Sequence, residues 1–179
     1  YKFETVSIVT TIFPLTDILK NIGGDMAEIT TLLPSGATPH TYEPTVEQAR
    51  AVAKADLIVF IGGGLDNWAL NLTSAAEKGS VIEIMSLIEE SVYDDELLRI
   101  AEDNYRHGHI QAVDSGRPGR KEAAELHAHH YGRYDPHVWL DPVLVKEIIA
   151  PLLTEELILI KPEQKDYFVE NLKTFQAAL

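Results

Sequence analysis

The stretch Leu57–Ile61 reads LIVFI and ends at three consecutive glycines, Gly62–Gly64. A near-continuous run of large apolar residues followed by a turn signal is typical of a parallel strand that is covered on both faces. We therefore expect this stretch to form a central strand of an α/β sheet, with helices packed on either side of it.

The sequence on both sides of this strand alternates between strand and helix patterns. Strands are predicted where β-branched and apolar residues cluster, and helices where apolar residues recur every three or four positions. The predicted strands are 6–12, 28–33, 57–61 and 81–84, and the predicted helices are 14–22, 45–55 and 66–78, the last capped by Asp66 or Asn67. Short connections favour right-handed βαβ units and thus a parallel four-stranded sheet flanked by helices.

This alternation stops near residue 89. The segment 104–134 is polar and glycine-rich, and it holds five of the seven histidines. A loop of this length is either functional or disordered, and we expect it to be mobile. Order resumes at 135–141 (DPHVWLD), after which one helix starts at Pro142 and a second spans 161–179. Pro151 is expected to kink or divide the first of these helices, because an interior proline removes a helical hydrogen bond.

Composition and charge exclude several classes of function. Fifteen Lys and Arg against 28 Asp and Glu give a net charge of −13, so we expect no nucleic-acid partner. The absence of cysteine excludes a disulfide scaffold, a cysteine-ligated zinc site and an iron–sulfur cluster. The sequence contains no apolar run of 18 residues, so we predict no membrane-spanning helix.

Two histidines lie in conformationally restricted settings. His40 belongs to GATPHTYEP and His137 to YDPHVWLDP, and each directly follows a proline. Proline restricts the backbone, so less entropy is lost when such side chains are collected around an ion. Neutral imidazole suits zinc, copper, nickel and iron. From spacing alone, the favoured interpretation of each residue is an ordinary loop histidine with one hydrogen bond.

The remaining histidines form H-x-H and H-x-H-H clusters in the long loop. Short tracts of this kind bind transition metals weakly and reversibly, because several imidazoles can reach one ion. The alternative is a solvated linker that happens to be rich in histidine. The candidate accessory ligands are His107, His109, His127, His129 and His130.

The aspartates that flank His137 are candidates for supporting roles. Either Asp135 or Asp141 can orient the imidazole through a hydrogen bond, and one of them is expected to cap the helix that starts at Pro142. Trp68 and Trp139 are interpreted as core residues rather than ligand contacts. Gly62–Gly64 lacks the lysine and hydroxyl residue of a P-loop, so phosphate binding is not predicted.

Taken in order, these motifs resemble a known family. The motifs are T-x-x-P-L near the start, L-L-P-x-G-x-x-P-H-x-Y-E-P at 32–44, A-D-L-I-V-x-I-G-x-G-L-D-x-W at 55–68, the histidine-rich loop, and D-P-H-V-W-L-D-P at 135–142. Together they are similar to the ZnuA/TroA-like solute-binding proteins, which deliver zinc or manganese to ABC importers. The likeness covers essentially the whole chain.

The resemblance implies an extracytoplasmic receptor with two α/β lobes joined by a long helix and a metal ion held between them. On this mapping, residues 1–141 form the amino-terminal lobe, residues 142–179 lead into and include the interlobe helix, and the second lobe is absent. His40 and His137 become the metal ligands of the first lobe. The histidine-rich loop favours zinc, with manganese as the alternative.

The resemblance also implies partners. These are a divalent metal ion and the membrane permease of an ABC importer. We further expect self-association through an apolar helix face that the missing lobe would cover. Two alternatives are kept: a metal-dependent hydrolase, which would need a third fixed ligand and a general base, and an adhesin-like role at the cell surface.

Overall fold

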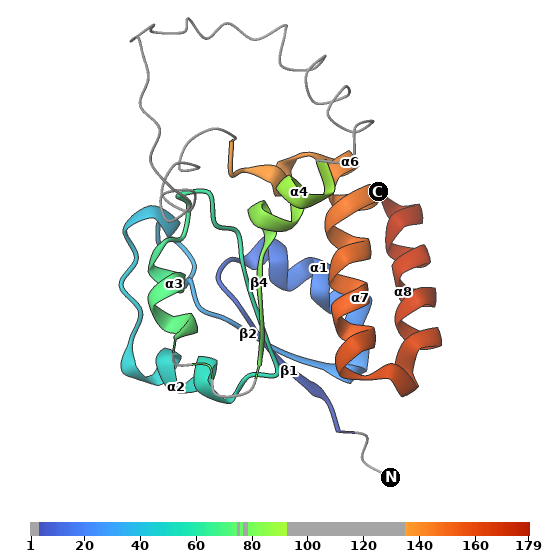
Figure 1. The fold of residues 1–179 in the computed structure, drawn as a ribbon, viewed down its shortest axis with the longest axis horizontal. Coiled ribbons are helices and arrows are strands. Elements are labelled where there is room, and N and C mark those ends of the chain that lie inside the picture. Colours follow the sequence, from blue (N-terminus) through green and yellow to red (C-terminus); the bar gives the residue numbers. More distant parts are fainter. Residues whose placement is uncertain (1–3, 75, 77–78, 93–134) are drawn as a thin grey trace, which may run out of the picture.

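The computed structural model describes residues 4–74, 76, 79–92 and 135–179 of the chain, and these form an α/β fold (Figure 1). The strands are β1 (Val6–Thr10), β2 (Ala27–Thr31), β3 (Leu57–Phe60) and β4 (Ser80–Glu83). The longer helices are α1 (Phe13–Gly23), α2 (Val46–Lys54), α3 (Trp68–Thr73), α4 (Ile84–Val92), α7 (Ala150–Ile160) and α8 (Lys165–Ala178). The predicted fold class is confirmed.

The four strands form one parallel sheet in the order β2-β1-β3-β4. Ile8 of β1 pairs with Ile29 on one side and with Leu57 on the other. Hydrogen bonds continue past the ends of the strands, since the amide of Leu32 donates to the Thr10 carbonyl at 2.8 Å. This continuation explains why the apolar pattern predicts β1 and β2 to end two residues later than they do.

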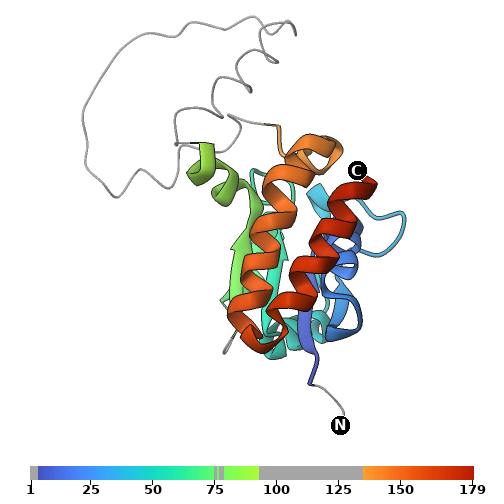
Figure 2. The ribbon, with the colours of Figure 1, turned by 90° about the vertical axis from the view of Figure 1, so that its right-hand side faces the viewer.

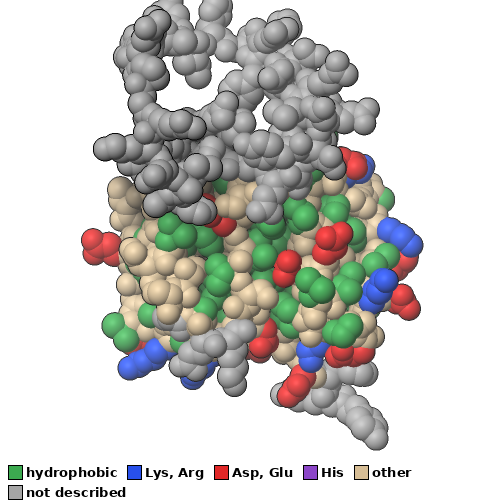
Figure 3. Space-filling model, in the orientation of Figure 1, with side chains coloured by type: hydrophobic (Ala, Val, Ile, Leu, Met, Phe, Trp, Pro, Cys, Tyr) green, Lys and Arg blue, Asp and Glu red, His purple; other side chains and the backbone are tan. Residues whose placement is uncertain are grey.

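Helices cover both faces of the sheet and enclose two apolar clusters. On one face, α1, α7 and α8 pack against each other and share the larger cluster, which includes Leu15, Ile61, Leu153 and Phe168. On the other face, Val52 of α2 packs in a smaller cluster with strand residues of the sheet. Figure 2 shows α7 and α8 side by side and antiparallel. In Figure 3, apolar and acidic side chains are spread over the visible described face, whereas the basic side chains lie toward its lower and right-hand margins.

Helix α3 starts later than predicted, because Asp66 does not cap it. Asp66 is fully buried, and its carboxylate accepts hydrogen bonds from the amides of Ile61 at 3.0 Å and Gly62 at 2.8 Å and from the Thr11 hydroxyl at 2.5 Å. Asn67 stands at the cap position without a side-chain hydrogen bond to the helix. Asp66 therefore ties together the ends of β1 and β3 instead of starting a helix.

The helical segment does not end at Pro151, but its hydrogen-bonding register changes just before the proline. A short helical turn at Pro142–Leu144 leads into a π-helical turn at Val145–Ile149, and α7 continues directly from it. Pro151 has no N–H, so the carbonyl five residues earlier in the π register, that of Lys146, lacks a helical donor. The side-chain amide of Gln176 on α8 donates to this carbonyl at 2.7 Å. The wider turn and the donated hydrogen bond together accommodate the proline.

Helix α8 packs against α1 and α7, with Phe168 turned toward the larger apolar cluster. Phe168 is fully buried, and Leu172 and Phe175 pack against the larger cluster. Asn171 also donates to the Ile22 carbonyl at the end of α1, at 2.9 Å. Phe168 is therefore not part of an exposed apolar face, whereas Leu172 and Phe175 are only partly buried, and self-association stays a prediction. Among the described residues, no helix is long and apolar enough to cross a membrane.

Candidate metal centre

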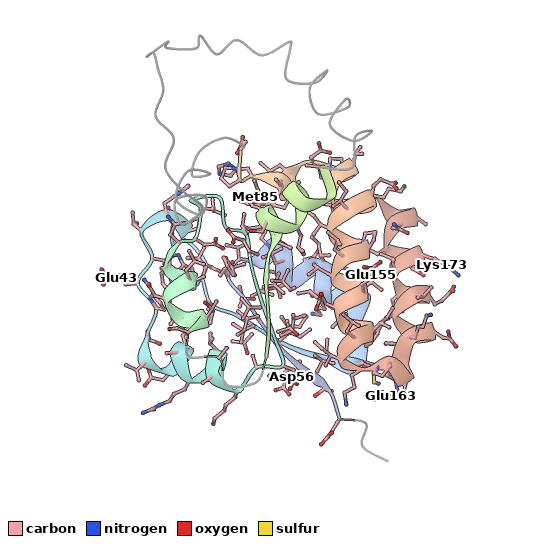
Figure 4. The ribbon with its side chains drawn as sticks, viewed as in Figure 1. Glu43, Asp56, Met85, Glu155, Glu163 and Lys173 are labelled. Carbon is pink, nitrogen blue, oxygen red and sulfur yellow. The ribbon has the colours of Figure 1, made fainter. Side chains whose placement is uncertain are left out.

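Both candidate ligands lie at the edge of the sheet where the parallel strands end. His40 sits in a 3₁₀ turn, Pro39–Thr41, that follows β2, and His137 directly precedes a second 3₁₀ turn, Val138–Leu140. In open parallel sheets, ligands bind at the carboxyl ends of the strands. Figure 4 labels Met85, the second residue of α4, at this edge.

The fold brings the two histidines together although 96 residues separate them in the sequence. Their ring centroids are 6.2 Å apart, with the ring planes tilted by 58°. Two imidazoles that share a zinc ion at ordinary zinc–nitrogen distances have centroids about 5 to 6 Å apart, so the spacing of this pair is close to that of a zinc-bound pair. Both side chains are exposed and accessible to an ion.

Asp135 determines which nitrogen of His137 faces outward. Its carboxylate oxygen lies 2.6 Å from Nδ1 of the ring and 3.0 Å from the His137 amide, which donates to it. The hydrogen bonds from the His137 amide and ring, with a weaker contribution from the charge of a protonated His137, hold the pKa of Asp135 below its ordinary value, although burial acts in the opposite direction. An ionised carboxylate can only accept, so Nδ1 carries the proton and Nε2 keeps its lone pair for a metal.

The second flanking aspartate has the other predicted role. Asp141 accepts hydrogen bonds from the amides of Val143 at 2.8 Å and Leu144 at 3.2 Å, and so caps the helix that starts at Pro142. The buried side chain of Val138 holds the intervening turn to the core. His137 is thus fixed between an orienting carboxylate and a capped helix.

The glycines after β3 support the turn of His137. Gly62 and Gly63 adopt left-handed φ angles of 79° and 57°. A Cβ atom on Gly63 would be in tight contact with Met85 and Pro136, the residue before His137. Gly63 therefore allows the close approach of this turn, a role that the sequence pattern alone does not reveal.

Both tryptophans pack against the histidine turns and are only partly buried. The indole N–H of Trp68 donates to the Pro39 carbonyl at 2.7 Å, next to His40. The ring of Trp139 lies 5.2 Å from the ring of His137, measured between centroids. Their interpretation as core residues is therefore incomplete, since each also contacts the turn of one candidate ligand.

The described residues do not include the predicted accessory ligands or a third metal ligand. The five histidines of the 104–134 loop, and its predicted mobility, lie outside the described residues. Within the described part of the chain, no group of three or more His, Asp or Glu side chains could hold a metal ion. The third fixed ligand that a hydrolase would need is therefore not supplied by these residues.

Comparison with known proteins agrees with the geometry. The family described as "Zinc-uptake complex component A periplasmic" (ZnuA) matches residues 8–179. The "High-affinity zinc uptake system protein ZnuA" of Yersinia pestis is 26% identical over 182 residues, which cover 100% of this chain and 54% of that protein. The "Manganese ABC transporter substrate-binding lipoprotein PsaA" of Streptococcus pneumoniae is 30% identical, covering 98% of this chain and 48% of that protein.

Comparison with solved structures gives the same family. A solved structure titled "Crystal structure of ZnuA" superposes with a TM-score of 0.68 at 28% identity, covering 98% of this chain and 56% of that one. The chain thus spans about half the length of the relatives that it matches. Since the family match extends over nearly all of its residues, the chain belongs to the ZnuA family of zinc-uptake components.

Proposed function

We propose that this chain is the metal-capturing amino-terminal half of an extracytoplasmic receptor that delivers zinc to the membrane permease of an ABC importer. The observation that carries the proposal is the pairing of His40 and His137, whose ring centroids lie 6.2 Å apart at the carboxyl edge of the sheet. Zinc is the cargo of such a receptor, so the site needs to bind and release it without making or breaking a covalent bond.

The orientation of His137 supports metal binding over a purely structural role. Its Nδ1 faces Asp135, so the nitrogen left for an ion is Nε2 on the far side of the ring. A carboxylate behind a histidine is a common support for a zinc ligand, because it fixes the ring and raises its basicity. A histidine with a purely local role would not need this arrangement opposite a second exposed imidazole.

The ligand type favours zinc over manganese. Imidazole nitrogens suit zinc, whereas manganese prefers carboxylate, carbonyl and water oxygens. The relatives named above include one named for zinc and one for manganese, so family membership leaves both ions open. Two imidazoles occupy two of the four positions around a tetrahedral zinc ion, and we infer from the family resemblance that the remaining protein ligands come from a second lobe.

Two further parts of the proposal concern the rest of the chain. We infer that residues 1–141 act as the first lobe and that α8 belongs to the helix that leads toward the second lobe. We also infer that His107, His109, His127, His129 and His130 act as accessory sites that collect zinc weakly. Metal binding by His40 and His137 can be tested independently of both inferences.

The proposal can be tested by proton NMR of the histidine rings with Mn²⁺ and Zn²⁺ as probes. The sequence has only seven histidines, so their ring signals can be assigned individually. Paramagnetic Mn²⁺ should broaden the signals of His40 and His137, and an equimolar amount of Zn²⁺ should restore sharp lines by displacing it. Broadening confined to the loop histidines, or Mn²⁺ that zinc does not displace, would refute a zinc site at this pair.

A further inference from the structure

The turn that carries His40 is not held by regular secondary structure. Its 3₁₀ turn comprises only Pro39–Thr41 and has no side-chain cap at Thr38. The side chains of His40 and Thr41 are exposed, so burial does not fix them. Contacts made by the residues on either side of His40 therefore have to hold this turn in place.

The flank before His40 is held by Trp68. The indole Nε1–H donates to the Pro39 carbonyl at 2.7 Å, and it does so from the first residue of α3. The indole is partly buried and packs against the smaller apolar cluster. A rigid two-ring side chain anchored in this way holds the carbonyl next to His40 at a fixed distance from the sheet.

The flank after His40 is held by Tyr42. Its ring packs edge-on against Trp68, with centroids 5.1 Å apart, and its hydroxyl donates to Oε1 of Gln48 at 3.0 Å. The side-chain amide of Gln48 donates in turn to the Leu32 carbonyl at 2.6 Å, and Gln48 completes a capping box with Thr45. Tyr42 is thereby connected to the end of β2 and the start of α2.

We propose that Trp68, Tyr42 and Gln48 form a clamp that pre-orients His40 for metal binding. The inference rests on the proposed function, and the three side chains are positioning residues that act through His40 without touching the ion. A ligand that is already held in place loses less conformational entropy when the ion binds, so the clamp raises metal affinity. Asp135 supports His137 in an equivalent way, so each histidine of the pair is positioned by its own set of side-chain contacts.

Two conservative variants release the two flanks separately. Trp68→Phe removes the indole donor but keeps an aromatic ring against Tyr42, and Tyr42→Phe removes the hydroxyl but keeps the ring against Trp68. The matched control is Tyr167→Phe, because the Tyr167 hydroxyl also makes one hydrogen bond, with the Asp25 amide at 3.3 Å, but does so on α8. Thermal denaturation of each variant reports whether it folds as the parent does.

The first measurement needs no metal. ¹³C relaxation of the His40 ring in the metal-free chain should show larger-amplitude motion in Trp68→Phe and in Tyr42→Phe than in the parent or in Tyr167→Phe. If the His40 ring moves equally in all four proteins, the clamp is refuted, whether or not the pair binds zinc. This outcome is therefore separate from failure of the proposed function.

The second measurement is the zinc affinity of the same proteins, with and without His40. Each clamp variant should bind zinc about three- to ten-fold more weakly than the parent, the range expected for the loss of one hydrogen bond. In a His40→Ala background the same substitutions should change affinity by less than about two-fold. An equal loss with and without His40 would show a general structural effect and overturn the positioning role.

Discussion

At the scale of single residues, the two aspartates beside His137 have different roles. Asp135 orients the imidazole ring, and Asp141 caps the helix that follows. Asp135 lies 2.6 Å from the ring nitrogen, whereas Asp141 accepts hydrogen bonds from amides of the following helix. The sequence predicts both roles but does not say which aspartate has which. That assignment depends on the turn conformation at His137, which residue identities alone do not specify.

Substitution of each aspartate by alanine should therefore give opposite results. Asp135→Ala is expected to lower zinc affinity by about ten-fold or more, because the imidazole loses the partner that fixes its ring and tautomer. Asp141→Ala should leave zinc affinity nearly unchanged and lower the free energy of unfolding by about 1 kcal/mol through loss of the helix cap. Calorimetric titration and urea denaturation measure the two effects. The same loss of affinity in both variants would contradict this division.

Glu156 provides a test of pH dependence away from the metal site. Burial raises the pKa of its carboxyl group, and the charge of Glu155 raises it further. The folded state therefore disfavours the ionised form, and this penalty is present at neutral pH and disappears as pH falls below the ordinary glutamate value, about 4.3. Glu156→Gln should thus be more stable than the parent at pH 7 and equally stable near pH 4. Urea denaturation at both pH values checks this, and a less stable variant at pH 7 would contradict it.

At the scale of elements, the strands were predictable because buried parallel strands are nearly continuous apolar runs. The end of β3 was less predictable, since Asp66 looks like a helix cap in sequence but is buried under the Gly62 turn. A carboxylate followed by a helix pattern is normally a cap, and only the tertiary fold brings Thr11 and the amide of Ile61 to it. The hydrogen bond from Trp68 to the turn of His40 is not predictable from the sequence for the same reason, since its acceptor, the Pro39 carbonyl, lies 29 residues away.

Loss of the Asp66 carboxylate should destabilise the fold strongly. Asp66→Ala leaves the amides of Ile61 and Gly62 buried without their acceptor, at an expected total cost of about 3 kcal/mol. Asp56→Ala is the matched control, because Asp56 also accepts from a strand amide, that of Ser7, but is exposed to solvent. Its cost should stay below about 1 kcal/mol. Similar unfolding midpoints for the two variants in urea would contradict this account of Asp66.

The π-helical turn before α7 makes a separate prediction about Gln176. If its amide replaces the N–H that Pro151 lacks, Gln176→Ala should cost about 1 to 2 kcal/mol of stability. In a Pro151→Ala background, the backbone can supply its own donor, so the same substitution should cost clearly less. A double-mutant cycle in urea measures this coupling. Equal costs in both backgrounds would show that Gln176 does not compensate for the proline.

At the scale of the whole molecule, the described residues of 142–179 pack on the same core as the strands. Leu153, Leu157 and Phe168 share the larger cluster with Leu15 of α1. The division at residue 141 therefore stays a prediction about function, since the core is continuous across it. The fold class and the two histidines were predictable from local patterns and motifs, but ligands contributed by distant segments leave no local signal.

The central claim is that His40 and His137 form the primary metal site of this chain. Zinc titration calorimetry of the parent beside a His40→Ala/His137→Ala double variant tests it most directly. The double variant should lose the tightest binding event and retain the weaker events of the loop histidines, with its unfolding midpoint unchanged. Coincident titration curves would contradict the claim and assign all zinc binding by this chain to residues outside the pair.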